Sequence, residues 1–332
     1  MNEKMLSTMK SLEVEGWLDI HVLRPAAFQF VRIFAKLGIH PNVVSILSML
    51  IGAGSAFFFV HGSYYYEGTT GLIYNLVAIL LLMTAYLFDD VDGQLARYTH
   101  KCTRLGRMLD GVASAFWYIP IYLLMIVRIY RFHDIEFGWF GIEDTQTNVI
   151  IATVIAGILI HIAGYFGNMA QERTADYYNQ IHLFFLKGEK GSELDSSVKL
   201  KEELDSMPKD GYFFDRLSQA SYINYTKLQE RRTPQFQKLM AKLHEMYSAT
   251  ENIPQEFRTS FHDASLPLMR YNNMLTFCFR TFLLAVFSLA DIPFFYFFVE
   301  ATLMSLLKLY VIRRHEKMCS QMYDHLVNSE TK

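Results

Sequence analysis

Six apolar stretches constrain this chain more than any other feature of its sequence. A hydrocarbon core of about 30 Å needs about 20 apolar residues in one helix. The stretches that reach or approach this length lie near residues 42–61, 70–90, 107–130, 148–168, 272–290 and 293–312. The chain is also 52% hydrophobic and 15% aromatic, which is too apolar for an ordinary soluble domain. We therefore predict an all-α integral membrane protein with six transmembrane helices.

The apolar stretches divide the chain into five segments. They predict a cytoplasmic N-terminus with an interfacial helix, four spans, a cytoplasmic helical insert, two further spans and a cytoplasmic tail, at residues 1–41, 42–168, 169–270, 271–314 and 315–332. Within the insert, the many charges of residues 187–210 favour a solvated loop. Residues 215–247 favour one or two amphipathic helices. The insert can act as a lid, a docking surface or a stabilising cap.

The N-terminal segment contains an amphipathic pattern from His21 to Leu37. Its apolar residues recur at helical spacing and are Leu23, Ala27, Phe30, Val31 and Phe34. Polar and basic residues take the other side and are Arg24, Gln29, Arg32 and Lys36. A basic amphipathic helix fits the cytoplasmic membrane surface. A helix packed on protein has the same periodicity, so both placements stay open.

The basic residues set the predicted orientation of the spans. They cluster between spans two and three and again after span six, at Arg97, Lys101, Arg104, Arg107, Arg313, Arg314 and Lys317. Residues 61–71 contain no Lys or Arg. Because cytoplasmic loops carry the excess of these residues, both termini and the segment around residues 89–110 are predicted to be cytoplasmic. The net charge of −2 gives no argument for nucleic-acid binding.

A polar motif lies at the end of the second apolar stretch. The residues at helical positions i, i+3, i+4, i+7 and i+8 share one face, and they are Asp89, Asp92, Gly93, Ala96 and Arg97. Gly106 and Asp110 are four residues apart at the opening of the next span. The short polar link at residues 98–105 lets the two helix ends face each other.

Three carboxylates that converge from two helices repel one another unless cations lie between them. Oxygen ligands of this kind suit Mg²⁺ or Mn²⁺, so Asp89, Asp92 and Asp110 are the predicted metal ligands. The glycines and Ala96 leave room beside the metal ions. Arg97 adds a planar positive group that matches phosphate. The motif therefore predicts a metal-dependent site for a diphosphate.

This spacing resembles the signature of the CDP-alcohol phosphotransferase family, also called CDP-alcohol phosphatidyltransferases. The resemblance implies an integral membrane enzyme that moves a substituted phosphate from a CDP-linked donor to an alcohol and releases CMP. It also implies that Gly93, Ala96, Arg97 and Gly106 shape the nucleotide pocket. The family pattern ends with a fourth aspartate, which serves as general base and metal ligand, and Ser114 stands at that position here. A homodimer is implied by the resemblance alone.

Two small-residue patterns also permit close approach between helices. They are Gly52-x-x-x-Ala56 and Ala163-x-x-x-Gly167. Packing within one chain explains both patterns as well as dimerisation does.

Two basic residues within the last two spans are further candidates, because charges in a membrane are costly and usually functional. Arg280 and Lys308 lie at similar depth in adjacent spans. The resemblance assigns acceptor binding to basic residues in this region when the acceptor is a sugar phosphate. The alternatives are that Arg280 pairs with Glu300 or another span, and that Lys308 extends to the interface.

The expected function is transfer of a substituted phosphate from a CDP-linked donor, CDP-diacylglycerol, to an alcohol or phosphorylated alcohol in the membrane. A non-catalytic relative that binds a CDP-linked lipid is an alternative because of Ser114. A UbiA-like prenyltransferase also uses aspartates and Mg²⁺ on a diphosphate, but its aspartate-rich motifs lie in both halves of the chain. A transporter would need paired broken helices in two corresponding halves. The sequence does not name the acceptor alcohol.

Overall fold

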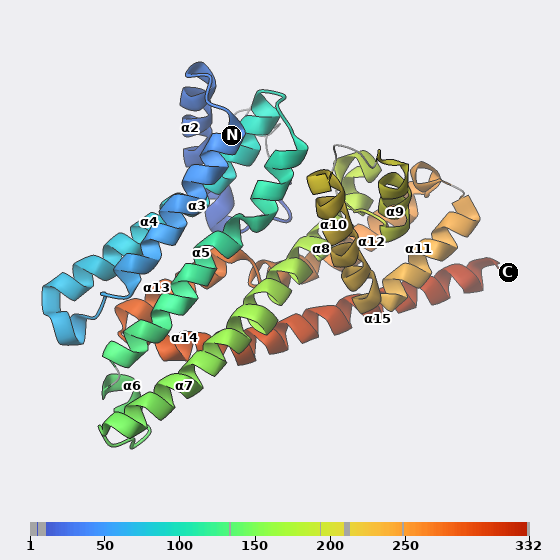
Figure 1. The fold of residues 1–332 in the computed structure, drawn as a ribbon. Helices are drawn as coiled ribbons and strands as arrows, with labels where there is room; N and C mark the ends of the chain where they lie inside the picture. Colours follow the sequence, from blue (N-terminus) through green and yellow to red (C-terminus); the bar gives the residue numbers. More distant parts are fainter. Residues whose placement is uncertain are drawn as a thin grey trace. The chain divides into compact units, whose positions relative to one another are not determined.

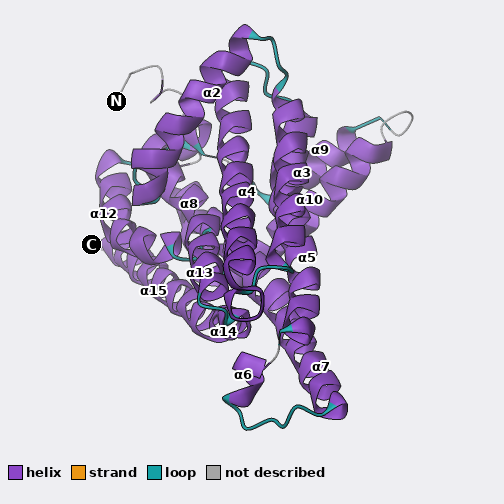
Figure 2. Cartoon of the chain, turned by 90° about the vertical axis from the view of Figure 1, so that its left-hand side faces the viewer, coloured by secondary structure: helices purple, strands orange, loops and turns teal. Residues whose placement is uncertain are grey.

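The computed structural model describes residue 5 and residues 11–132, 134–192, 194–208, 213–247 and 249–330. Every regular element in these residues is helical (Figure 2). The helices that are long and apolar enough to cross a membrane are Pro41–Phe59, Tyr64–Tyr98, Leu109–Arg131, Gln146–Lys187, Gln255–Leu289 and Pro293–Asn328. For the described part of the chain, these six helices confirm the prediction of an all-α protein with six candidate spans.

The chain folds into two compact units. The first comprises Met1–Gln171 and Phe277–Ser305, and the second comprises Glu172–Thr276 and Leu306–Lys332. The elements of the first unit are η1 (Asp19–Leu23), α2 (Arg24–Lys36), α3 (Pro41–Phe59), α4 (Tyr64–Tyr98), α5 (Arg104–Arg131), α6 (Asp134–Gly138), α7 (Gln146–Ile162), η2 (Ala163–Asn168), α13 (Phe277–Leu289), α14 (Pro293–Val299) and η5 (Glu300–Met304).

Side-chain caps decide where the long helices of the first unit begin. The side chains of Ser63, Thr103 and Thr145 each accept a hydrogen bond from a backbone N–H in the first turn of α4, α5 and α7. The predicted second span ends near residue 90, whereas α4 continues to Tyr98. Hydropathy falls at Asp89, but nothing in the following residues stops a helix. The apolar stretch therefore marks only the middle of α4.

Helices α3, α4 and α5 run side by side (Figure 1) and form the core of the first unit together with α6, α7, α13 and α14. Gly52 allows α3 to approach α5 closely, because a Cβ atom at this position would lie 2.0 Å from Cδ1 of Trp117. The Trp117 indole also donates to the Ser48 carbonyl on α3 at 3.0 Å. A Cβ at Gly167 would lie 3.4 Å from Cγ of Glu300, which is an ordinary van der Waals distance. Close packing within the chain thus accounts for the glycine of the first small-residue pattern.

Arg128 is a buried charge that the sequence analysis gave no role. Its side chain is 1% exposed and donates to the carbonyl oxygens of Phe59 and Ser288 and to Oδ1 of Asn75, at 2.8 to 3.1 Å. It also pairs with Asp291 at 3.0 Å. These partners lie on or beside α3, α4 and α13, so one guanidinium connects four helices, including its own α5.

The N-terminal amphipathic helix packs on protein. Ala27, Phe28 and Val31 of α2 are buried in a cluster with Val91 and Leu95 of α4. This observation supports the second of the two placements that the sequence left open.

Arg24 departs from the predicted pattern. The sequence placed it on the outer polar side, but its side chain is 15% exposed and forms ion pairs with Glu15 and Asp90, each at 3.0 Å. The prediction was wrong because periodicity cannot show that a polar side chain finds buried partners from elsewhere in the chain.

The second unit is built from helices of the predicted insert and of the C-terminus. Its elements are α8 (Met169–Lys187), η3 (Glu189–Gly191), α9 (Ser197–Ser206), α10 (Phe213–Arg232), α11 (Pro234–Tyr247), η4 (Thr250–Asn252), α12 (Gln255–Asn273) and α15 (Ser305–Glu330). Two helices, α10 and α11, occupy the predicted amphipathic region. The predicted loop at residues 187–210 is wrong where α9 forms. Ser196 caps this helix, and the Glu230 carboxylate accepts a bond from the Ser197 backbone N–H at 2.9 Å.

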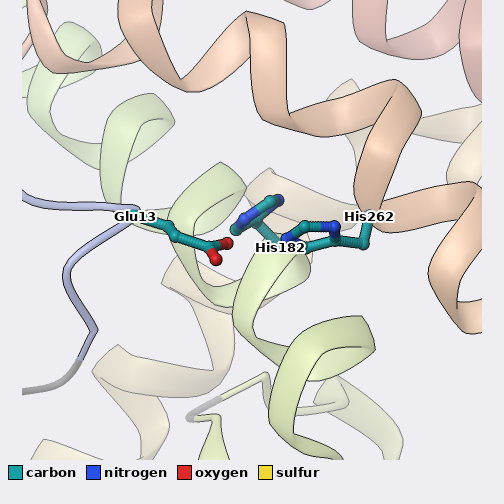
Figure 3. Close-up of side chains that lie close together, drawn as sticks. All are labelled: Glu13, His182 and His262. Carbon is teal, nitrogen blue, oxygen red and sulfur yellow. The ribbon is translucent and has the colours of Figure 1, made fainter.

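Aromatic and histidine side chains join α8 to α12 inside the second unit. The ring centroids of His182 and His262 lie 4.9 Å apart (Figure 3). Nδ1 of His182 lies 2.7 Å from Oγ of Ser265. Phe185 stacks on Phe261 with ring centroids 3.7 Å apart. These contacts show that the insert has an aromatic core of its own.

Candidate functional site

The structure brings together the three aspartates of the predicted metal site. One oxygen from each of Asp89, Asp92 and Asp110 lies within 4.8 Å of the other two. Asp92 is buried, Asp89 is half-buried and Asp110 is exposed. The cluster is therefore closed on the side of α4 and open at the start of α5, so a ligand can reach it.

A short turn makes this convergence possible. The Lys101 N–H bonds the Ala96 carbonyl at 2.9 Å, and His100 adopts a φ of 55°. A residue in the left-handed region together with this bond is typical of a Schellman motif, which ends a helix sharply. Thr103 then starts α5 by accepting a hydrogen bond from the Gly106 N–H at 2.9 Å. The signal that ends α4 and the signal that starts α5 are both local. The end of α4 and the start of α5 therefore lie next to each other.

The predicted glycines lie on the two helices that carry the carboxylates, Gly93 on α4 and Gly106 on α5. A Cβ at Gly106 would lie 3.1 Å from both Oδ1 of Asn42 and Oγ1 of Thr103. A Cβ at Gly93 would lie 3.5 Å from the Arg97 guanidinium, which places that group one turn along α4. Asn42 was missed by the sequence analysis. Its buried amide oxygen has no hydrogen-bond partner among the described residues, so it is a candidate acceptor for a ligand.

The residues present fit a divalent cation. Oδ2 of Asp92 is buried and has no hydrogen-bond partner among the described residues. A buried carboxylate oxygen without a partner is unfavourable, and a cation would satisfy it. All three side chains offer hard oxygen ligands, which suit Mg²⁺ or Mn²⁺. Asp89, Asp92 and Asp110 are thus the residues that would hold the metal.

A second polar network joins the N-terminal segment to α4. Arg24 bridges Glu15 and Asp90, and the Tyr86 hydroxyl donates to Oδ1 of Asp19 at 2.7 Å. Tyr86 and Asp90 are one helical turn apart, and Asp90 directly follows Asp89, one of the predicted metal ligands. The N-terminal segment therefore holds α4 at the level of the carboxylate cluster.

Burial and charge act in opposite directions on this network. Burial raises the pKa of the Glu15 and Asp19 carboxyls, and Arg24 opposes that rise at both. Burial alone would lower the pKa of Arg24, but Asp90 and Glu15 raise it above its ordinary value. Arg24 therefore keeps its positive charge, because the Asp90 and Glu15 carboxylates stabilise it. The sequence signal that could have revealed this network is the acidic residue next to Asp89, which the metal motif does not use.

The remaining predicted site residues are Ser114, Arg280 and Lys308. Ser114 is half-buried on α5, one turn after Asp110. Arg280 is fully buried and donates to the Asn168 carbonyl at 3.2 Å, and its charge attracts the Glu300 carboxylate. This environment favours the alternative in which Arg280 compensates the charge of Glu300 on another span. Lys308 belongs to the second unit, so a joint role with Arg280 in acceptor binding stays a prediction.

An uncharacterised protein of Aquifex aeolicus (strain VF5) is 32% identical over 88 residues, which cover 26% of this chain and 38% of the relative. No solved structure matches the chain. Residues 38–186 match the family described as CDP-alcohol phosphatidyltransferase. The match includes the whole motif from Asp89 to Asp110 and also Ser114. Residues 38–186 therefore form a CDP-alcohol phosphatidyltransferase domain, as the motif predicts.

Proposed function

We propose that the protein transfers a substituted phosphate from CDP-diacylglycerol to an alcohol or phosphorylated alcohol and releases CMP. The observation that carries this proposal is the convergence of Asp89, Asp92 and Asp110 within 4.8 Å. The match of residues 38–186 to the CDP-alcohol phosphatidyltransferase family supports the coarser statement that a phosphatidyl group is transferred from a CDP-alcohol. We also propose that this site faces the cytoplasm, where CDP-linked donors and Mg²⁺ are available.

Each motif residue has a role in this reaction. Divalent cations held by the three aspartates would neutralise the diphosphate and make CMP a better leaving group. Arg97 would pair with a phosphate oxygen, while Gly93, Ala96 and Gly106 give the nucleotide space. The acceptor oxygen forms a bond to the phosphorus as the bond from that phosphorus to CMP breaks. The acceptor hydroxyl must also lose its proton to a base.

The proposal is tested by the lipid products of the purified full-length protein. The protein is supplied with CDP-diacylglycerol, Mg²⁺ and a panel containing inositol phosphate, glycerol phosphate, serine and inositol. Mass spectrometry is expected to find one new phospholipid together with an equal amount of CMP. A protein that releases no CMP with any acceptor would instead support the alternative of a CDP-lipid-binding protein without catalysis.

Substitutions of Ser114 distinguish the transferase from a CDP-lipid-binding protein without catalysis. A serine hydroxyl is a poor base near neutral pH, and general-base help contributes about 10²- to 10⁴-fold to a rate. We expect slow or acceptor-restricted turnover in the native protein, and faster turnover with tighter Mn²⁺ binding in Ser114→Asp. The neutral variant Ser114→Asn is the control for side-chain size. Equal rates for Ser114→Asp and Ser114→Asn would show that no carboxylate is needed at this position.

Arg24 provides a test of how the site is positioned. Because Arg24 pairs with Asp90 beside Asp89, Arg24→Gln should displace the start of the motif. A misplacement of about 1 Å can lower a rate about 10²-fold, so we expect kcat to fall by about that factor while the acceptor KM changes little. Arg24→Lys should recover part of the rate.

The matched control for this variant is Arg32→Gln, which removes an exposed arginine from the same helix α2. We expect Arg32→Gln to keep the native rate. Equal kcat values for Arg24→Gln, Arg32→Gln and native protein would contradict the positioning role.

A further inference from the structure

The second unit contains a recess between side chains of α8, α10 and α15. Arg173 and Arg232 line it together with Tyr177, Tyr225 and Thr233. Tyr225 and Arg232 lie on α10, which is part of the insert and falls outside the matched family domain. The transfer reaction proposed above gives these residues no role.

Two arginines, Arg173 and Arg232, give the recess positive charge. Among the described residues, neither Arg173 nor Arg232 forms an ion pair. The Arg173 guanidinium lies over the Tyr225 ring, 5.4 Å from its centroid. Lys308 lies close enough to Arg232 for the two charges to repel each other. Cations gathered in this way are stabilised by a bound anion.

Neutral donors complete the lining of the recess. The Tyr177 oxygen accepts a hydrogen bond from Nε2 of Gln237 at 3.0 Å, and a phenol hydroxyl can act as a donor as well as an acceptor. Burial and the nearby Asp176 carboxylate raise the pKa of Tyr225, so this phenol also stays protonated. Guanidinium and hydroxyl donors together match the oxygens of a phosphate group.

A second recess adjoins the first and has an acidic lining. The two share Tyr177, Tyr225 and Gln229, and the second is lined by Asp176 and Asp195. Carboxylates accept hydrogen bonds, so they suit a hydroxyl or ammonium group. A basic and an acidic recess side by side thus match a ligand with a phosphate at one end and hydrogen-bond donors at the other.

We propose that these adjoining recesses bind a phosphate ester, with the phosphate between Arg173 and Arg232 and the alcohol's hydroxyl or ammonium group beside Asp176 and Asp195. The ligand is either a water-soluble phosphorylated alcohol or the headgroup of a phospholipid. The site lies in the second unit, and binding there does not depend on the transfer reaction.

Calorimetric titration of the full-length protein in neutral detergent tests this site without any CDP-linked donor. The probes are O-phosphoethanolamine and micellar lysophosphatidylethanolamine, which carry the same headgroup. Saturable binding of at least one probe is expected. Equal affinities identify a soluble ester as the ligand, and tighter binding of the lysolipid identifies a lipid headgroup. Absence of saturable binding by both probes would overturn the proposal.

Charge variants locate the bound phosphate. The double variant Arg173→Gln, Arg232→Gln is expected to raise the dissociation constant at least about tenfold, because two charge-assisted hydrogen bonds are lost. Arg231→Gln is the matched control, since Arg231 is exposed on α10 and does not line the recess. An unchanged dissociation constant in the double variant, or an equal loss in Arg231→Gln, would show that this recess does not hold the phosphate.

Discussion

Asp110→Asn should lower CMP release at least about a hundredfold, because even residues that only support metal ligands change metal affinity or activity by 10- to 100-fold. The substitution keeps the size of the side chain but removes one of the three negative charges that lie within 4.8 Å of one another. Asp89→Asn should act in the same way. Mn²⁺ binding, followed by electron paramagnetic resonance, should weaken in parallel with the rate.

The control for these variants is Asp144→Asn, which removes a carboxylate from an exposed loop. It should leave both CMP release and Mn²⁺ binding unchanged. Native rates in Asp110→Asn and Asp89→Asn would remove the metal site from the mechanism. A lost rate with unchanged Mn²⁺ affinity would mean that the carboxylates act on the substrate and do not bind the metal.

Arg128→Met should be the most destabilising of the single changes considered, lowering the free energy of unfolding by about 3–5 kcal/mol. The variant leaves the Asp291 carboxylate without its buried partner. It also leaves Oδ1 of Asn75 and the Phe59 and Ser288 carbonyls without their shared donor. Denaturation of the protein in mixed micelles, followed by circular dichroism, measures the loss.

The control variant is Arg131→Met, one turn further along α5. It removes a positive charge without disturbing the buried hydrogen bonds of Arg128. Arg131 is exposed at the end of α5 and lies over the Phe132 ring, so Arg131→Met should change the unfolding free energy by less than about 1 kcal/mol. Adding Asp291→Asn to Arg128→Met should recover part of the stability, because the buried charge is then removed. Equal destabilisation by the two methionine variants would rule out the buried network as the cause.

The carboxylate cluster could be predicted from the sequence because its geometry is local. One helical face holds Asp89 and Asp92, and a turn of a few residues brings Asp110 to them. The periodicity of a helix and the length of the link are sufficient to show that these residues meet. The six spans were predictable for a similar reason, since apolar length is a property of each stretch alone.

The buried ion pairs could not be predicted because their partners are distant in sequence. Arg24 pairs with Asp90, and Arg128 pairs with Asp291. A basic residue near the edge of an apolar stretch has the same pattern whether it reaches water or a buried carboxylate. The helix α9 was missed for a related reason, since Glu230 helps to satisfy its first turn from another helix.

The uncharged part of α4 has a further consequence for where the chemistry takes place. The helix is kinked at Gly68, whose φ of 57° is not helical. From Thr69 to Phe88 it contains no Asp, Glu, Lys or Arg, and at 1.5 Å per residue this stretch is about 30 Å long. That length matches the hydrocarbon thickness of a bilayer, about 30 Å. When α4 spans a membrane, Asp89 stands at the first level where the acyl chains end and the headgroups begin. A diacylglycerol-linked donor can then keep both acyl chains in the bilayer throughout the reaction, while its diphosphate lies at the depth of the aspartates. In the proposed reaction, a water-soluble acceptor would meet this donor at the membrane surface, and neither reactant would have to cross it.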